Sequence, residues 1–360
     1  MKAGTAARPD DPAWVDDVSA IDAAWLTDML RAASIDAVVA HVSAAAVGTG
    51  QMGSCFRLTV RYAEGRGPER LVVKLPSTDP ASRAAGAMGY QTEVGFYQHL
   101  ASEVGIRTPK CWYAAVSDDG TSFTLVLEDL APGVPGDQIA GCTVAQARAA
   151  AVNAACLHGR TWCRAELLAL PWLIPPLASS APMLSPFLQD ATAAFLERYV
   201  TRPADTEVLQ AFAERFVPWA QGRHEPFSLV HNDYRLDNLL FFPPGSEDTV
   251  AAVDWQALTI GLPARDLAFL LATGLDVEDR RTAERSLVDH YHETLAAGGV
   301  KGYSPGECWE DYRYALFQAP LITVLGAYVA RPTERGDRMF IVMAERACTA
   351  IRDLGALTLI

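Results

Sequence analysis

The chain has 360 residues, of which 50% are apolar and 20% are charged, and its formal net charge at pH 7 is −13. At roughly 150 residues per domain, this length provides two domains or lobes, and the apolar content excludes a disordered chain. The acidic balance argues against a nucleic-acid partner, because neutralising a phosphate backbone requires a basic face. It is compatible with a nucleotide pocket, where a few placed charges and Mg²⁺ are sufficient.

The sequence indicates neither secretion nor membrane insertion. Residues 1–17 are polar, do not resemble a signal peptide, and predict a loose tail. The most apolar stretch, 315–330, is interrupted by Gln318 and is shorter than the about 20 residues that a membrane span requires, so we expect a buried helix there. The seven cysteines are odd in number and include no Cys-x-x-Cys pair, which argues against a disulfide framework or a structural zinc site. We therefore expect a cytoplasmic protein without a membrane span.

The segment 18–130 predicts a small lobe built on a mostly antiparallel sheet. Short β-branched or alternating runs separated by turns are typical of strands, and they occupy 42–47, 55–62, 71–75, 111–116 and 123–127. Apolar residues at helical spacing predict helices over 21–33, with Ser19 as a candidate cap, and over 90–102.

The segment 131–360 predicts a larger, mainly helical lobe. Helical spacing marks 144–162, 187–199, 207–219, 266–273 and 277–297, and two further helices follow. Short strands within 229–242 and 249–254 border a polar loop. The expected fold is α+β with two lobes and a hinge near 129–137, and the cleft between two such lobes is a usual ligand site.

Gly48, Gly50 and Gly53, followed by Ser54, form a G-x-G-x-x-G string. With 26 glycines in the chain, about 0.1 such strings are expected by chance, so the string alone is weak evidence. It joins two predicted strands, whereas a dinucleotide fingerprint requires a strand followed by a helix. Backbone amides of such a hairpin can close over phosphate oxygens, although an ordinary turn is an alternative explanation.

Lys74 lies in a predicted apolar strand of a chain that uses arginine for almost every other cation. Only four lysines are present, against 26 arginines. A compact ammonium at this place suits contact with the α- and β-phosphates of a nucleotide. Glu93, in the following helix, can form the ion pair that orients the lysine, although a helical glutamate is more often solvated.

The strongest motif is His231-Asn-Asp233-Tyr-Arg-Leu-Asp-Asn238. His-x-Asp with an asparagine five residues later is expected about 0.004 times by chance in this composition. The aspartate can accept a hydroxyl proton while the asparagine binds Mg²⁺. Asp254, at the end of a strand, is placed to be a second metal ligand. Glycine loop, strand lysine, helix glutamate, H-x-D-x-x-x-x-N and strand-end aspartate follow the order of a kinase fold.

Two segments resemble the aminoglycoside phosphotransferase and choline kinase superfamily of small-molecule kinases, which has a protein-kinase-like two-lobe fold. They are 231–241 (HNDYRLDNLLF) and 253–271 (VDWQALTIGLPARDLAFLL). Within the superfamily, 93–100 (EVGFYQHL), 125–132 (LVLEDLAP) and the Asp-Trp-Gln in place of Asp-Phe-Gly are most similar to the ecdysteroid-kinase-like (CHK-type) branch. The resemblance covers roughly residues 40–350.

The resemblance implies roles for individual residues. Asp233 would be the catalytic base and Asn238 and Asp254 the Mg²⁺ ligands, while Lys74 with Glu93 would hold the α- and β-phosphates. The backbone of the hinge residues Glu128, Asp129 and Leu130 would meet the adenine.

Further expectations concern the catalytic loop and its surroundings. Arg235 would steady the transferred phosphate, and Asp266 would brace the loop. Asn232 departs from the family pattern because it replaces a glycine. The activation segment and Ala-Pro-Glu of protein kinases are missing, which argues against a protein substrate.

The expected activity is transfer of the γ-phosphoryl group of Mg²⁺·ATP to a hydroxyl of a small-molecule alcohol. The proline-rich apolar segment 170–187, expected as a loop, favours an apolar, steroid-like acceptor. The acid-rich segment 276–311 favours instead a cationic aminoglycoside or a choline-like amino alcohol, although a solvated helix face explains it as well. A non-catalytic nucleotide-binding protein on the same fold is a further alternative. The oligomeric state is not readable from the sequence.

Overall fold

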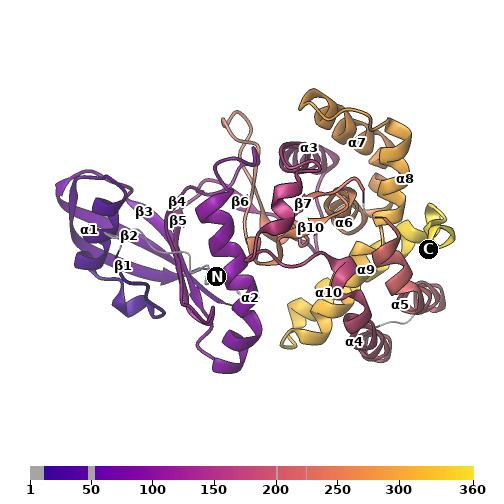
Figure 1. Ribbon diagram of the computed structural model, residues 1–360, viewed down its shortest axis with the longest axis horizontal. Helices are drawn as coiled ribbons and strands as arrows, with labels where there is room; N and C mark the ends of the chain where they lie inside the picture. Colours follow the sequence, from indigo (N-terminus) through magenta and orange to yellow (C-terminus); the bar gives the residue numbers. More distant parts are fainter. Residues whose placement is uncertain (1–11, 48–52, 200–201, 224) are drawn as a thin grey trace.

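A five-stranded antiparallel sheet forms the core of the N-terminal lobe, with its strands in the order β1-β2-β3-β5-β4 (Figure 1). The computed structural model describes residues 12–47, 53–199, 202–223 and 225–360. The elements of this lobe are α1 (Ala23–Ala32), β1 (Ala37–Ala46), β2 (Gly53–Gly65), β3 (Arg70–Pro76), α2 (Pro80–His99), β4 (Cys111–Val116) and β5 (Phe123–Glu128). The expected antiparallel sheet with one inserted helix is confirmed.

Helix α2 begins ten residues earlier than the apolar pattern predicted, at Pro80 instead of Tyr90. Asp79 caps it by accepting a hydrogen bond from the Ser82 amide at 2.8 Å, and proline is favoured in the first turn. The first half of the helix is rich in alanine and glycine, so it has no apolar stripe from which to predict it. Likewise, Asp22 and not Ser19 caps α1, by accepting from the Trp25 amide.

The two faces of this sheet belong to different cores. Helix α1 covers the outer face with Leu26, Leu30 and residues of β1 to β4 in one apolar cluster. Helix α2 packs on the inner face and lies toward the C-terminal lobe in Figure 1, and its Phe96 belongs to the cluster that fills that lobe. The inner face of the small lobe and the large lobe therefore share one core.

The C-terminal lobe is mainly helical and carries two small antiparallel sheets, β10-β7 and β6-β8-β9. Its helices are α3 (Val144–Arg160), α4 (Leu177–Arg198), α5 (Pro203–Gly222), α6 (Ala264–Gly274), α7 (Val277–Ala297), α8 (Pro305–Ala315), α9 (Gln318–Val329) and α10 (Glu334–Asp353). Its strands are β6 (Val134–Pro135), β7 (Ser228–Val230), β8 (Leu239–Phe241), β9 (Val250–Ala252) and β10 (Thr259–Gly261). The α+β two-lobe architecture is as expected. Within the described residues no helix is long and apolar enough to cross a membrane.

The segment expected as a proline-stiffened loop is in large part helical, because α4 starts at Leu177 and includes Pro182 and Pro186. A proline in a helix leaves the carbonyl four residues earlier without its amide donor. Here the Gln221 side chain on α5 donates to the Ala178 carbonyl at 3.1 Å, which compensates for Pro182. A tertiary contact therefore allows a helix where the local sequence predicted none.

The N-terminal segment is attached to the small lobe over its described part, so the prediction of a loose tail is wrong for residues 12–17. The amide of Val15 donates to Thr124 Oγ1 at 2.8 Å, and Tyr113 donates to the Pro12 carbonyl at 2.7 Å. Asp16 forms an ion pair with Arg83 of α2 at 2.7 Å. These contacts fasten the segment across β4, β5 and α2.

Candidate active site

The hairpin of β8 and β9 brings Asn238 and Asp254 to the same end of a small sheet. Leu239 pairs with Ala252, and the Val253 amide donates to the Asn238 carbonyl at 3.0 Å. Asp254 follows with φ 66° and ψ 73°, a left-handed conformation that turns the chain away from the strand. The two oxygen-bearing side chains expected to bind metal are thus neighbours although they are 16 residues apart in the sequence.

Lys74 connects this hairpin to the small lobe. Its Nζ lies 2.9 Å from Asp254 Oδ1 and 2.7 Å from Glu93 Oε2. Burial acts to lower the pKa of Lys74, but the two carboxylates outweigh it and raise the pKa above its ordinary value, so the ammonium stays charged. The same contact holds the pKa of Asp254 below its usual range despite burial, whereas burial raises the pKa of Glu93.

Helix α2 fixes Glu93 against the C-terminal lobe. The Trp255 amide donates to Glu93 Oε1 at 3.3 Å, and the Trp255 ring stacks on Phe96 with centroids 4.0 Å apart. Trp255 is fully buried, and its ring also contacts that of His231. The tryptophan next to Asp254 therefore joins the lysine–glutamate pair to the loop that carries Asp233.

The loop between β7 and β8 places Asp233 beside Asn238. The Asn238 amide nitrogen donates to Asp233 Oδ2 at 2.8 Å and to its carbonyl at 2.9 Å. Arg235 lies with Nε 3.1 Å from Asp233 Oδ1 and pairs with Asp237 at 2.8 Å. Asp233 Oδ1 is buried and accepts no hydrogen bond from the described part of the chain, so its contact there is the ion pair with Arg235.

Asp266, in the first turn of α6, holds the start of this loop. Its Oδ2 accepts from the His231 amide at 2.7 Å and its Oδ1 from the Asn232 amide at 2.9 Å. His158 of α3 lies 3.2 Å from Oδ2. Although burial opposes it, these hydrogen bonds keep the pKa of Asp266 below its usual value, so the carboxylate is ionised. The contacts are those expected of a residue that braces the loop.

Asn232 adopts φ 69°, the left-handed region in which asparagine is the best tolerated residue after glycine. Its Oδ1 accepts from Gln318 Nε2 at 2.9 Å and from Arg265 at 3.1 Å. Asparagine, where the sequence resemblance led us to expect glycine, therefore adopts a conformation that glycine readily takes and adds a side-chain link from the loop to α6 and α9.

The glycine string that was predicted to contact the phosphates lies only partly within the residues that the structure describes. Gly48 and Gly50 lie outside the described residues. Gly53 and Ser54 begin β2, where a Cβ at Gly53 would lie 2.7 Å from the Leu75 carbonyl oxygen, so only glycine fits.

The side chains of the hinge residues form ion pairs or are buried within the protein. Glu128 pairs with Arg107 at 3.1 Å, and Asp129 pairs with Arg57 at 2.9 Å. Leu130 is buried, and its carbonyl accepts from the Gly133 amide. The backbone contacts to adenine expected of this segment stay a prediction.

The donor set fits Mg²⁺, which prefers oxygen ligands in octahedral geometry and takes few of them from protein. Asn238 offers Oδ1, because its amide nitrogen is engaged with Asp233, and Asp254 offers an ionised carboxylate. No group of three or more His, Cys, Asp or Glu side chains in the described chain is arranged to hold a metal. Two protein oxygens with phosphate and water oxygens are the expected set for a nucleotide-bound Mg²⁺.

Sequence reasoning missed three polar residues that support this site. Asp237 pairs with Arg235 and also with Arg335 at 3.2 Å, while Arg265 and Gln318 hold Asn232. Gln318 carried a signal, because it is a polar residue in the most apolar stretch of the chain. Arg265 and Asp237 had none, since arginine and aspartate are common surface residues.

The family model for the phosphotransferase enzyme family matches residues 56–306, which include every described residue of this site from Lys74 to Asp266. The chain belongs to the phosphotransferase enzyme family. The match is to the family as a whole, so the similarity to the CHK-type branch stays a prediction.

Solved structures of family members have the same fold at low sequence identity. The GDP complex of wild-type aminoglycoside 2'-phosphotransferase-IIIa is 15% identical, with a TM-score of 0.55 over 90% of this chain and 98% of that one. Choline kinase from Cryptosporidium parvum is 9% identical, with a TM-score of 0.53 over 88% of this chain and 89% of that one.

Among curated proteins, the uncharacterized oxidoreductase dhs-27 of Caenorhabditis elegans is 23% identical over 323 residues, 78% of this chain and 38% of that protein. The chain spans between 6% and 38% of the length of the curated relatives it matches. The similarity is therefore to a part of these longer proteins.

Proposed function

We propose that this protein is a small-molecule kinase that transfers the γ-phosphoryl group of ATP to a hydroxyl group. The observation that carries the proposal is a continuous chain of contacts at one site. Glu93 pairs with Lys74, Lys74 with Asp254, and Asn238 with Asp233, while the β8–β9 hairpin holds Asp254 beside Asn238. A nucleotide is supported further by the GDP bound to the structural neighbour.

In this proposal Asp233 accepts the proton of the acceptor hydroxyl as the oxygen–phosphorus bond forms. The bond between the γ-phosphorus and the bridging oxygen breaks, and its electron pair leaves with ADP. Lys74 orients the phosphates, and Arg235 adds positive charge beside the transferred group. Mg²⁺, held by Asn238 and Asp254, would neutralise charge that develops on the phosphate oxygens. Positioning and electrostatic stabilisation carry the catalysis.

The acceptor is a small alcohol, for which the sequence suggested two classes. An apolar, steroid-like alcohol is favoured by the apolar segment 170–187, and an aminoglycoside or choline-like alcohol by the acid-rich segment 276–311. The acidic side chains of 276–311 include several that pair with arginine: Glu284 with Arg280, Asp289 with Arg285, and Glu310 with Arg313. These paired carboxylates do not favour a cationic ligand at that segment.

The test is the Asp233→Asn variant, with nucleotide binding and phosphorylation measured separately. We expect turnover to fall by at least about 10³-fold because the proton acceptor is lost, while MgATP binding changes by less than about threefold. ATP consumption over an alcohol library and calorimetric titration with MgATP measure the two quantities. Asp190→Asn, an exposed position on α4, is the matched control. Unchanged turnover in Asp233→Asn would contradict the role of the base.

A non-catalytic nucleotide-binding protein is distinguished by Asp254→Ala. A kinase hydrolyses ATP slowly in the presence of Mg²⁺, and this hydrolysis should disappear in the variant. A binding protein would show thermal stabilisation by nucleotide and no hydrolysis in either form.

A further inference from the structure

A pocket of about 310 Å³ in the C-terminal lobe is lined by residues of α4, α5, α6, α8 and β10. Its wall includes Ile260 and Gly261 of β10, and β10 pairs with β7, the strand that leads directly into the loop. Arg265 lines the pocket and donates to Asn232, the residue before Asp233, at 3.1 Å. Arg265 and Asn232 therefore connect the pocket to the proposed base.

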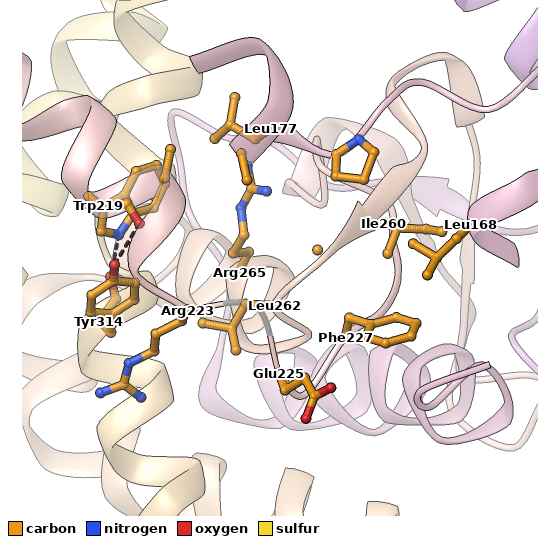
Figure 2. A pocket seen from close by; sticks show the side chains of 14 residues that line it. Leu168, Leu177, Trp219, Arg223, Glu225, Phe227, Ile260, Leu262, Arg265 and Tyr314 are labelled. Carbon is orange, nitrogen blue, oxygen red and sulfur yellow. Dashed lines mark hydrogen bonds between the residues drawn. The ribbon is translucent and has the colours of Figure 1, made fainter. Parts of the chain in front are cut away.

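Most of the pocket wall is apolar. It is formed mainly by Leu168, Leu177, Trp219, Phe227, Ile260 and Leu262 (Figure 2). Trp219 and Tyr314 satisfy each other's polar groups, because Trp219 Nε1 donates to the Tyr314 carbonyl at 2.9 Å and Tyr314 donates to the Trp219 carbonyl. Their rings therefore need no polar partner from a ligand, and the wall suits an apolar molecule.

Arg265 is the buried charge of this pocket, with 6% of its surface exposed. Its Nε donates to Gln318 at 2.7 Å, so both of its hydrogen-bond partners are neutral amides, and its guanidinium lies 5.7 Å from the centre of the Trp219 ring. No carboxylate in the described part of the chain lies within ion-pair distance of it. Burial lowers the pKa of Arg265 to about 10, although the charge of the neighbouring Asp266 carboxylate opposes this shift. A buried cation in this state favours an anionic ligand.

The other charged groups at the pocket are already balanced or solvated. Arg223 forms an ion pair with Asp311 and lies 4.6 Å from the centre of the Tyr314 ring. Glu225 is exposed to solvent at the edge, where its charge is screened.

The start of α4 also favours a negatively charged ligand. Leu177 and Ala178, the first two residues of this helix, line the pocket, and α4 begins without a side-chain cap. Free amides and the helix dipole favour a negative group at such a terminus. Two independent features, a buried arginine and an uncapped helix start, thus point to an anion.

We propose that this pocket binds the phosphoryl acceptor and that the acceptor is an apolar alcohol with one carboxylate or similar acidic group, recognised by Arg265. This inference rests on the proposed kinase function and narrows its substrate class. It disfavours a polycationic acceptor in this pocket, because an ammonium would be repelled by Arg265 and the carboxylate that lines the pocket among the described residues, Glu225, is exposed to solvent.

Direct binding without nucleotide tests the pocket independently of activity. The probes are β-hydroxydecanoate, its methyl ester, and the amino alcohol in which an ammonium replaces the carboxylate. Titration calorimetry should show the hydroxy acid binding at least about tenfold more tightly than the amino alcohol, with the ester between them. Equal binding, or tighter binding of the amino alcohol, would overturn the proposal.

Substitutions at Ala178 and Arg265, with a control at Ala194, assign the binding to this pocket. Ala178→Trp fills the pocket and should weaken hydroxy-acid binding at least about tenfold, whereas Ala194→Trp, exposed on the same helix, should leave it unchanged. Arg265→Gln should remove the preference for the acid, and Arg265→Lys should restore part of it. Circular dichroism verifies the folding of each variant. If Ala178→Trp bound the hydroxy acid as tightly as the wild type does, the proposal would be overturned.

Turnover of the same probes separates this inference from the kinase function. Phosphorylation of the hydroxy acid in preference to the amino alcohol supports both. Phosphorylation of the amino alcohol alone, unaffected by Ala178→Trp, leaves the kinase function intact and overturns the pocket as the acceptor site. If no alcohol of a broad library consumes ATP, the kinase function fails, and with it the acceptor role of the pocket.

Discussion

Lys74 shows how a single side chain is specified by its neighbours. Its ammonium lies between two carboxylates at 2.7 and 2.9 Å in a largely buried position, so a compact, point-like charge is required. The guanidinium of arginine is planar and longer, and it would have to move either Glu93 or Asp254. This explains why a chain with 26 arginines has a lysine at this position.

Lys74→Arg should therefore impair the site although the charge is kept. A displacement of reacting groups by about 1 Å costs about 10²-fold in rate, so we expect kcat/KM to fall by at least that factor. Steady-state kinetics with a saturating acceptor measures it. Lys301→Arg, an exposed position, is the control and should behave as wild type. Wild-type kinetics in Lys74→Arg would show that the shape of the cation is unimportant.

At the residue scale the sequence singled out side chains that the structure brings together, but not the residues that support them. Asp233, Asn238 and Lys74 were singled out by residue types and spacing that are rare in this composition, and Asp254 by its place at the end of a strand. Arg265 could not be found, because its importance comes from burial and from contacts with residues 33 and 53 positions away. Such contacts exist only once the chain is folded.

The catalytic loop, from His231 to Asn238, is the element on which the site depends. It contains little regular structure, and buried partners on other elements replace the hydrogen bonds that a helix or strand would provide. Asp266 accepts two successive amides at its start, and Gln138 accepts the Leu236 amide at 2.9 Å. The loop is thus held at both ends.

Removal of the Asp266 charge should produce a pH-dependent loss of stability. The pKa of Asp266 is lower in the folded protein than its unfolded value of about 3.9, so its ionisation stabilises the fold above about pH 4 and the contribution disappears as the pH falls through the folded pKa. Asp266→Asn should lower the free energy of unfolding by about 3 kcal/mol at pH 7. The difference from wild type should narrow below about pH 4.

Urea unfolding at a series of pH values measures this difference. Asp118→Asn, at an exposed turn, should change the free energy of unfolding by less than about 0.5 kcal/mol at any pH. If the difference in the free energy of unfolding between wild type and Asp266→Asn stayed constant down to pH 3, the assignment of Asp266 as an ionised carboxylate would be contradicted.

Elements were predicted well where an apolar stripe exists and poorly where it does not. Helix α7 has the predicted bounds, whereas α2 was predicted to start ten residues too late and the start of α4 was missed. The start of α2 lacks large apolar residues, and α4 tolerates Pro182 through a side chain of α5. Local pattern could reveal neither fact.

At the scale of the whole molecule, the two lobes are not independent. The core cluster of the C-terminal lobe includes Val94 and Phe96 of α2 and Leu125 of β5. A backbone hydrogen bond from the Ala252 amide to the Arg107 carbonyl also joins the lobes. A continuous apolar core favours cooperative unfolding of the parts that share it.

Thermal unfolding should therefore occur as a single transition. MgATP at a hundred times its dissociation constant should stabilise the protein by about 2.7 kcal/mol and raise the Tm of that transition by about 3–6 °C. Differential scanning calorimetry, with comparison of the calorimetric and van't Hoff enthalpies, measures both. Two resolved transitions, of which nucleotide shifts only one, would contradict the shared core.

The packing of Trp255 on Phe96 has a consequence for control of the enzyme. In a kinase that is switched by swinging its glutamate-bearing helix outward, that helix must be able to leave the large lobe. Here such a movement would pull a fully buried indole out of its stack and break the hydrogen bond from its amide to Glu93. These contacts therefore oppose an outward movement of the helix, and we expect the supply of nucleotide and alcohol, instead of an on–off rearrangement, to govern the rate of the proposed phosphoryl transfer.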